Sequence, residues 1–360
     1  MDGTPSLHIH ETGSLIEVDD ERSGREAVRQ VVRDGADFVK VYSRLTPDTY
    51  RAIAHESRRL GIPFAGHCPD RLSPAEAGDL GQASIEHMYP IVLATSTREA
   101  EIRRELAEVR VDPTDTDPVG RYSNWFRQIH PLEYETVTGH DPRRADALFA
   151  RFVAHRTRVV PTLAVHRTLE LPDENPRSDD TWKYLPSWIV EDWPRQMSIV
   201  VDSRTPEQAR QIREIHAHRR RLVGRMFRAG VPVLAGTDTG NPYLVPGFAL
   251  HRELELLVAC GLSPLRALQA ATREPAALLG AASTLGTVEP GRLADLVVLD
   301  ADPLCDIRNT TAIHAVVVDG RLIDDARRSA LLAEVQHAAS TTPPPAPEAA
   351  PPAGCACDAH

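Results

Sequence analysis

Apolar and polar positions repeat along the chain in one order: a helix with one apolar face, a glycine, and then a short apolar, often β-branched run. Each such helix begins at a serine or threonine that can serve as its N-cap and ends before a glycine. These helices are expected at 23–34, 46–60, 73–80 and 205–229. The apolar runs predict strands at 37–42, 62–67, 83–88, 158–165 and 231–238. Because helices and strands alternate and the strands carry few polar residues, the pattern predicts a parallel sheet covered by helices.

Two helix boundaries can be predicted more closely. The first helix is expected to begin at Ser23, because Ser23 and Glu26 have the spacing of a capping box. Residues 263–281 are expected to form two short helices that are separated at Pro275.

The pattern changes at residue 286. The segments "GRLADLVVLD" and "AIHAVVVDGRLID" predict strands, and Asp319-Gly320 is typical of a tight hairpin turn between them. We therefore expect a partial barrel at 1–285 and a small β-sandwich remnant at 286–330. The Pro/Ala-rich tail at 338–360 is expected to be disordered.

Two long stretches, at about 98–150 and 166–204, are expected to be irregular insertions at the mouth of the barrel. All four tryptophans lie in them: Trp125, Trp182, Trp188 and Trp193. Two roles stay open for these side chains, since they can pack the insertions down or form a lid over a substrate pocket.

Composition narrows the function classes. A formal net charge of −10, with arginines dispersed among acids, argues against nucleic acid and anionic membrane surfaces as partners. The five scattered cysteines do not form a disulfide framework, and no apolar run has the length of a membrane span. The first residues do not resemble a signal peptide, so a cytoplasmic protein is expected.

Polar residues stand at the ends of the predicted strands. Lys40, one of two lysines among 41 basic residues, lies near the end of the first strand. His67 and Asp238 are the last residues of the strands predicted at 62–67 and 231–238, and His87 is next to last in the strand predicted at 83–88. Strand C-termini meet on one face of a parallel α/β barrel. A single histidine there is more often structural, but imidazoles and carboxylates gathered on one face predict a zinc-type site.

The same segments resemble the amidohydrolase superfamily, in its imidazolonepropionase-like and Xaa-Pro-dipeptidase-like branch. The motifs "DFVKVY", "IPFAGHCP", "SIEHM" and "VPVLAGTDT" resemble its fourth, fifth, sixth and eighth strands. The segments "GLSPLRALQAATREPAALLG" and "GTVEPGRLADLVVLDADPL" resemble its C-terminal part, and the likeness covers about 20–98 and 205–325. The resemblance implies an α/β TIM-type (β/α)8 barrel that lacks its first two or three strands here.

The resemblance also implies a metal centre. Lys40 would react with carbon dioxide to give a carbamate that bridges two metal ions, which arginine cannot do because its guanidinium stays protonated. His67 and His87 would bind the second metal, and Asp238 would bind the first metal and act as general base. The implied cofactor is one or two divalent ions, expected to be zinc. For Lys40 alone, an ion pair or a lysine that reaches solvent is the alternative.

The family's His-x-His metal motif has no counterpart well before Lys40. His8 and His10 have the pattern, but they lie where a third strand is expected and are not assigned as ligands. Three explanations stay open: the missing segment lies outside this chain, the protein is an inactive remnant, or another chain supplies the rest.

We therefore expect a metal-dependent hydrolase that acts on C–N bonds of amides, cyclic amides or dipeptides through metal-activated hydroxide. The alternative is an inactive or partial amidohydrolase-like protein that only binds a ligand or partner. The expected partner is a small-molecule substrate, with no nucleic acid or membrane, and self-association as a homo-oligomer stays open.

Overall fold

The computed structural model describes residues 16–110, 118–201 and 204–344. Two compact units divide the chain. The first draws on Met1–Pro161 and Thr205–Val233, and the second on Thr162–Arg204 and Leu234–Ala356. Each unit is described by itself.

A parallel sheet forms the centre of the first unit. Its strands are β1 (Val39–Val41), β2 (Phe64–Gly66), β3 (Ser84–Glu86) and β4 (Arg158–Val160). They pair in chain order, β1-β2-β3-β4, as consecutive strands of a TIM-type barrel do. The apolar runs therefore predicted the parallel sheet correctly, and closure of the ring stays a prediction.

Two of the expected strands are shorter than predicted. The run at 158–165 ends as a strand at Val160, because Pro161 and a left-handed Thr162 (φ 46°) turn the chain into a helix that begins at Leu163. The run at 231–238 forms one isolated parallel bridge, from Val233 to Val159, and no ladder.

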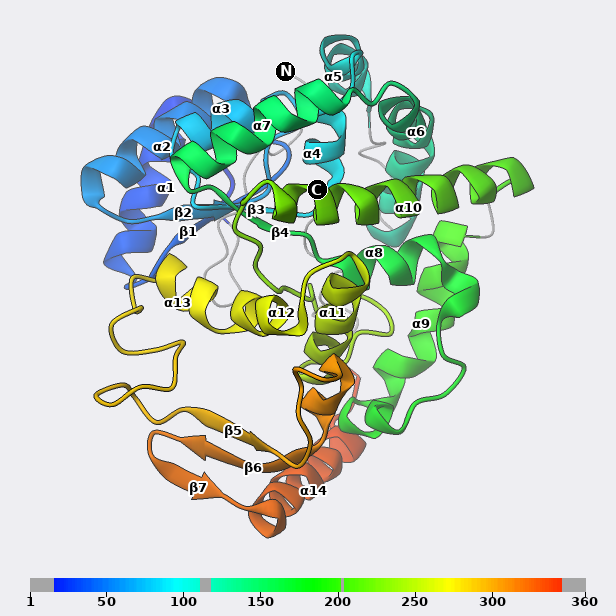
Figure 1. Cartoon of the computed structure of the whole chain (residues 1–360). Coiled ribbons are helices and arrows are strands. Elements are labelled where there is room, and N and C mark those ends of the chain that lie inside the picture. Colours follow the sequence, from blue (N-terminus) through cyan, green and yellow to red (C-terminus); the bar gives the residue numbers. More distant parts are fainter. Residues whose placement is uncertain (1–15, 111–117, 202–203, 345–360) are drawn as a thin grey trace. The chain divides into compact units, whose positions relative to one another are not determined.

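Helices cover the sheet of the first unit. They are α1 (Glu21–Arg33), α2 (Pro47–Leu60), α3 (Pro74–Asp79), α4 (Tyr89–Ala94), α5 (Glu99–Glu108), α6 (Pro118–Thr138), α7 (Pro142–His155) and α10 (Pro206–Arg228). Figure 1 shows α2, α3 and α7 lying over the strands. The predicted N-caps Thr46, Ser73 and Thr205 are confirmed, because each side chain accepts a hydrogen bond from a backbone N–H of the first turn.

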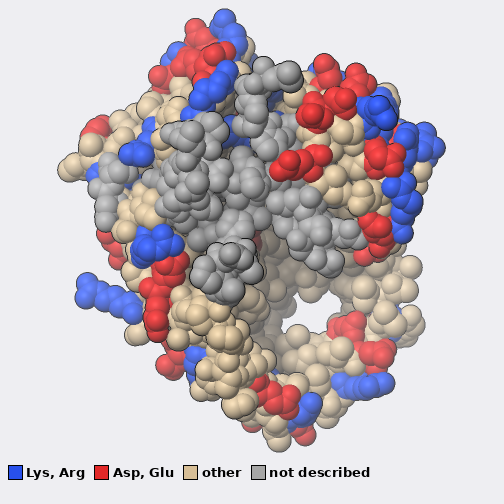
Figure 2. Space-filling model, turned by 180° about the vertical axis from the view of Figure 1, so that it is seen from behind, with Lys and Arg blue, Asp and Glu red and all other residues tan. Residues whose placement is uncertain are grey.

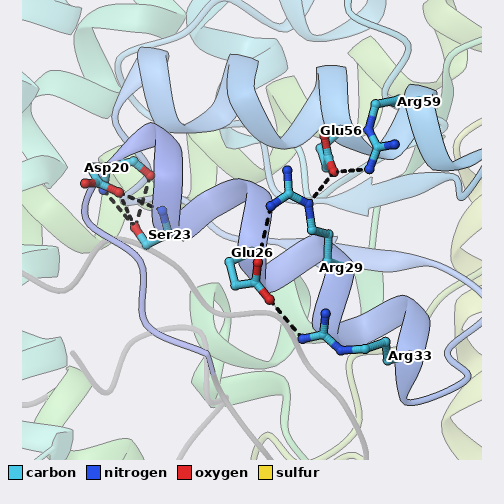
Figure 3. Close-up of polar contacts among 7 residues, drawn as sticks. All are labelled: Asp20, Ser23, Glu26, Arg29, Arg33, Glu56 and Arg59. Carbon is cyan, nitrogen blue, oxygen red and sulfur yellow. Dashed lines mark hydrogen bonds and ion pairs between the residues drawn. The ribbon is translucent and has the colours of Figure 1, made fainter.

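The predicted start of α1 at Ser23 is wrong. Asp20 is the N-cap: its Oδ1 accepts a hydrogen bond from the Ser23 backbone N–H over 2.7 Å, and Ser23 Oγ accepts one from the Asp20 N–H over 3.1 Å. Ser23 is thus the third helical residue, and an aspartate is at least as good a cap as a serine. Figure 3 shows this box and shows Glu26, the expected partner, paired with arginines instead.

The same view shows how α1 is joined to α2. Arg29 on α1 donates to Glu56 on α2 over 2.7 Å, and Arg59 donates to the same carboxylate (Figure 3). Glu56 is only 3% exposed, so two guanidinium groups compensate a carboxylate that folding removes from water. The Arg29–Glu56 pair fixes the first helix against the second, and Arg59 holds the same carboxylate from within α2.

The stretches expected to be irregular are largely helical where they are described. In 98–150 the chain forms α5, α6 and α7, and α7 begins with the same signals as the predicted helices, Asp141 as N-cap and Pro142 in the first turn. Helix α6 contains Pro131 and α9 (Ser187–Val201) contains Pro194, which made both patterns look broken. That these stretches are insertions stays a prediction.

The second unit combines helices with a small sheet. Its helices are α8 (Leu163–Glu170), η1 (Pro172–Glu174), η2 (Asp180–Tyr184), α9, α11 (Phe248–Ala259), α12 (Pro264–Ala271), α13 (Arg273–Leu278), η3 (Ile307–Thr311) and α14 (Asp325–Thr341). Helices α12 and α13 are separated at Thr272 and not at Pro275, which fits within the first turn of α13. Trp182 and Trp193 pack edge to face, with ring centroids 5.4 Å apart, which favours the packing role for these two tryptophans.

The small sheet has the expected hairpin. Strands β5 (Leu296–Leu299), β6 (Ile313–Val318) and β7 (Arg321–Ile323) are antiparallel, and α14 lies beside β6 and β7 (Figure 1). Asp319 and Gly320 both have positive φ, 49° and 73°, as the predicted turn requires. Helix α14 extends to Thr341, so the tail is not disordered from 338; residues 345–360 lie outside the described part.

The surface carries charges of both signs. On the face drawn in Figure 2, basic and acidic residues are interspersed in small groups among uncharged ones. Among the described residues, no helix combines the length and apolarity needed to cross a membrane.

Candidate metal centre

Side chains from three neighbouring strands meet at the C-terminal ends of β1, β2 and β3. Lys40 is the middle residue of β1, His67 directly follows β2, Glu86 is the last residue of β3, and His87 follows it. His87 has a left-handed backbone (φ 64°), a conformation that costs free energy in a residue other than glycine and often marks functional sites.

The two histidines face each other through the same ring nitrogen. His67 Nε2 lies 3.0 Å from His87 Nε2, and the ring planes meet at 79°. On the other side of its ring, His67 Nδ1 lies 2.7 Å from Ser43 Oγ. His67 is 7% exposed, so this contact fixes the orientation of a buried ring.

Lys40 and Glu86 form an ion pair beside the histidines. Lys40 Nζ lies 3.1 Å from Glu86 Oε2, which in turn lies 3.9 Å from His67 Nε2. The ammonium group also lies over the Tyr42 ring, 5.2 Å from its centroid. The ion pair is one of the two alternatives considered for Lys40; carboxylation of this lysine stays a prediction.

The donor set fits a divalent metal ion. Ligand atoms of His67, Glu86 and His87 lie within 4.8 Å of one another. Two imidazole nitrogens on one tetrahedral zinc lie about 3.3 Å apart, close to the spacing of the two Nε2 atoms. Neutral imidazoles with a carboxylate are the ligands that zinc and related ions take.

The structure brings together three of the four predicted site residues: Lys40, His67 and His87. Asp238 belongs to the second unit, where its backbone is left-handed (φ 52°) and its carboxylate accepts a hydrogen bond from Asn241 Nδ2 over 3.2 Å. Its part in the centre stays a prediction. His8 and His10 lie outside the described residues.

Glu86 and Ser43 were not predicted from the sequence. A signal for Glu86 was present, because in the motif "SIEHM" it stands near the end of a predicted strand, directly before His87. Ser43 has no such signal, since its contact depends on how the loop after β1 is folded.

The second unit contains a buried carboxyl group of its own. Glu253 on α11 is fully buried and accepts hydrogen bonds from the backbone N–H groups of Leu163 and Ala164, over 3.0 and 2.7 Å. Burial raises the pKa of Glu253 to about 7 and lowers the pKa of neighbouring His166 to about 4. The two N–H groups begin α8, so the carboxylate caps this helix.

A comparison with known families decides the relationship. The chain matches the amidohydrolase family over residues 3–323. It belongs to the amidohydrolase family. The predicted resemblance is thereby confirmed, and family membership implies the TIM-type barrel to which the four parallel strands correspond.

Comparisons with individual proteins show what share of each relative's length this chain matches. An imidazolonepropionase of Symbiobacterium thermophilum is 37% identical over 107 residues, which are 28% of this chain and 24% of that protein. The structure of AH, bottromycin amidohydrolase, has a TM-score of 0.66 at 21% identity, over 92% of this chain and 65% of that one. A Xaa-Pro dipeptidase with bound methionine in the active site has a TM-score of 0.53 at 20% identity, over 85% of this chain and 59% of that one. The chain therefore spans less than two thirds of the length of each.

Proposed function

We propose that this amidohydrolase hydrolyses C–N bonds of small amides with the help of a divalent metal ion held by His67 and His87. The observation that carries the proposal is the pair of Nε2 atoms facing each other over 3.0 Å at the ends of β2 and β3. Family membership supports the reaction class, and the imidazolonepropionase and dipeptidase relatives support a cyclic amide or a dipeptide as substrate.

The residues have separate roles in this proposal. The proposal requires the His67 tautomer with its proton on Nδ1, which donates to Ser43 Oγ and leaves the lone pair on Nε2 for a metal. Lys40, as a carbamate formed with carbon dioxide, is the proposed bridging ligand. Asp238 is the proposed general base, which takes a proton from the attacking water and passes it to the leaving nitrogen. When bound, a divalent metal activates water and polarises a carbonyl group.

Metal analysis and a substrate panel test the proposal together. Purified protein is loaded with Zn²⁺ or Mn²⁺, its metal content is measured by mass spectrometry, and turnover is followed on Xaa-Pro dipeptides, N-acyl amino acids and hydantoin-type rings. We expect one or two equivalents of metal and hydrolysis of at least one class.

The double variant His67→Ala/His87→Ala is the matched control and should lose both metal and turnover. Metal uptake without turnover on any class would favour the alternative of a protein that only binds a ligand. Absence of metal from the loaded wild type would refute the proposal.

A further inference from the structure

The Lys40 side chain crosses the neighbouring strand to reach Glu86. It lies on β1, whereas Glu86 ends β3, and β2 runs between these two strands. Two strand spacings separate β1 from β3, which is about 10 Å. A lysine side chain has four rotatable bonds and a strongly hydrated end, so nothing in its own chemistry directs it across β2 and not into solvent.

Gly66 leaves the space over β2 in which the lysine lies. A Cβ atom at Gly66 would lie 3.2 Å from Lys40 Cγ and 2.9 Å from the Val41 backbone nitrogen. The backbone of Gly66 has φ 122°, which side-chain-bearing residues rarely adopt. The strand between Lys40 and Glu86 is therefore bare where the two side chains pass over it.

Glu86 holds the far end of the lysine. The pair is partly shielded from water, with side-chain exposures of 22% for Lys40 and 20% for Glu86. Partly shielded ion pairs gain Coulomb energy but lose hydration, so their net contribution to stability is small and does not by itself account for this one. The location of the pair has a consequence for the metal centre. Glu86 Oε2 lies 3.9 Å from His67 Nε2, so pairing with Glu86 brings Lys40 Nζ to the side of the His67 ring that carries Nε2.

We propose that Glu86 is a positioning residue of the metal centre. Its carboxylate pairs with the protonated Lys40 amine and so draws this side chain across β2, over Gly66, to the metal ligands His67 and His87, before the amine loses its protons to water and is converted by carbon dioxide to the carbamate. This inference rests on the proposed function, in which Lys40 contributes to metal binding. Glu86 then acts through Lys40 and gives no contact of its own to the substrate.

A double-mutant cycle on metal affinity tests the inference. Zn²⁺ affinity is measured by competition with a chromogenic chelator for wild type, Glu86→Gln, Lys40→Gln and the double variant. Loss of a partner that orients a metal ligand typically weakens binding about 10- to 100-fold. We expect that loss for each single variant, and little further loss when Glu86→Gln is added to Lys40→Gln.

Two further variants keep the cycle interpretable. Glu56→Gln changes a shielded glutamate of the same unit that is paired with arginines and not with Lys40, and this variant should bind Zn²⁺ like the wild type. Glu86→Ala repeats the cycle with a shorter side chain, so the result does not depend on the folding of one variant.

The outcomes separate this inference from the proposed function. Equal losses in both Lys40 backgrounds would overturn the positioning role and make Glu86 a direct ligand. Wild-type affinity in Glu86→Gln and in Glu86→Ala would also overturn it, while leaving the proposed function intact. A wild-type protein that binds no Zn²⁺ would instead refute the proposed function.

Discussion

At the residue scale, a lysine in a chain that otherwise uses arginine is the most informative side chain. Lys40 is one of two lysines among 41 basic residues, and it stands in a strand between Val39 and Val41, which are both fully buried. An ion pair with Glu86 would suit arginine at least as well. What lysine adds is an amine that can lose its proton and react, so the choice of residue favours a chemical role over a structural one.

The first prediction concerns Ser43. The change Ser43→Ala removes the hydroxyl oxygen that lies 2.7 Å from His67 Nδ1. The freed ring can adopt other tautomers and rotations, so Zn²⁺ affinity should fall about 10-fold, with the unfolding midpoint nearly unchanged. Chelator competition and thermal unfolding on the same samples measure both quantities.

Ser57→Ala is the matched control for Ser43→Ala. Ser57 is fully buried in α2, and no described group accepts or donates a hydrogen bond at its Oγ. Its removal should leave Zn²⁺ affinity unchanged. A Ser43→Ala protein that binds metal as tightly as Ser57→Ala would show that the serine does not orient His67.

The sequence predicted the site residues that stand at strand ends, but not the residues that contact and orient these side chains. Lys40, His67 and His87 could be found because a parallel sheet sends all its strand ends to one face. Glu86 and Ser43 act through contacts between different strands and loops. Such contacts depend on register and on side-chain direction, which a single sequence does not fix.

At the element scale, local signals predicted helix starts better than strand lengths. Thr46, Ser73 and Thr205 were identified because a cap acts on backbone groups only two or three residues away. Strand lengths depend on pairing with segments far away in sequence. The run at 231–238 accordingly forms a single bridge although its residues are typical of a strand.

The second prediction concerns the helix cap that Glu253 provides for α8. Burial raises its pKa from the ordinary 4.5 to about 7, so the folded state binds the proton more tightly than the unfolded state. Because burial penalises the ionised carboxylate more than the two cap hydrogen bonds favour it, the protonated group stabilises the fold; this contribution is complete below about pH 4.5 and is lost as the pH rises through about 7, by roughly 3 kcal/mol in total. Glu253→Gln cannot titrate, so its stability should vary less than that of the wild type over this range.

Urea unfolding between pH 5 and 8 measures this difference. Tryptophan fluorescence suits the experiment, because Trp182, Trp188 and Trp193 all belong to the unit that contains Glu253. Glu255→Gln, on the same helix but part-exposed, should keep the pH dependence of the wild type. Parallel pH profiles for wild type and Glu253→Gln would contradict a raised pKa.

At the scale of the whole molecule, the sequence predicted the family and a barrel-type sheet but not the division into two compact units. The division follows no boundary in composition: the chain leaves the first unit after Pro161, returns at Thr205, and leaves again after Val233. Lys40, His67 and His87 belong to the first unit and Asp238 to the second. If Asp238 has its proposed role, binding of one metal should therefore change protection from hydrogen exchange in both units.

The third prediction tests this consequence by hydrogen exchange with and without Zn²⁺. A ligand that binds only the folded state stabilises it by RT ln(1 + [L]/Kd), about 2.7 kcal/mol at a free concentration of 100 times Kd. We expect slower exchange around β1 to β3 and also around Asp238, while β6, which contributes no residue to the proposed centre, serves as an internal control and stays unchanged. In Asp238→Asn the protection around position 238 should disappear and that of the strands should weaken. Protection confined to the first unit in the wild type would remove Asp238 from the centre and leave its function to His67, His87 and their neighbours.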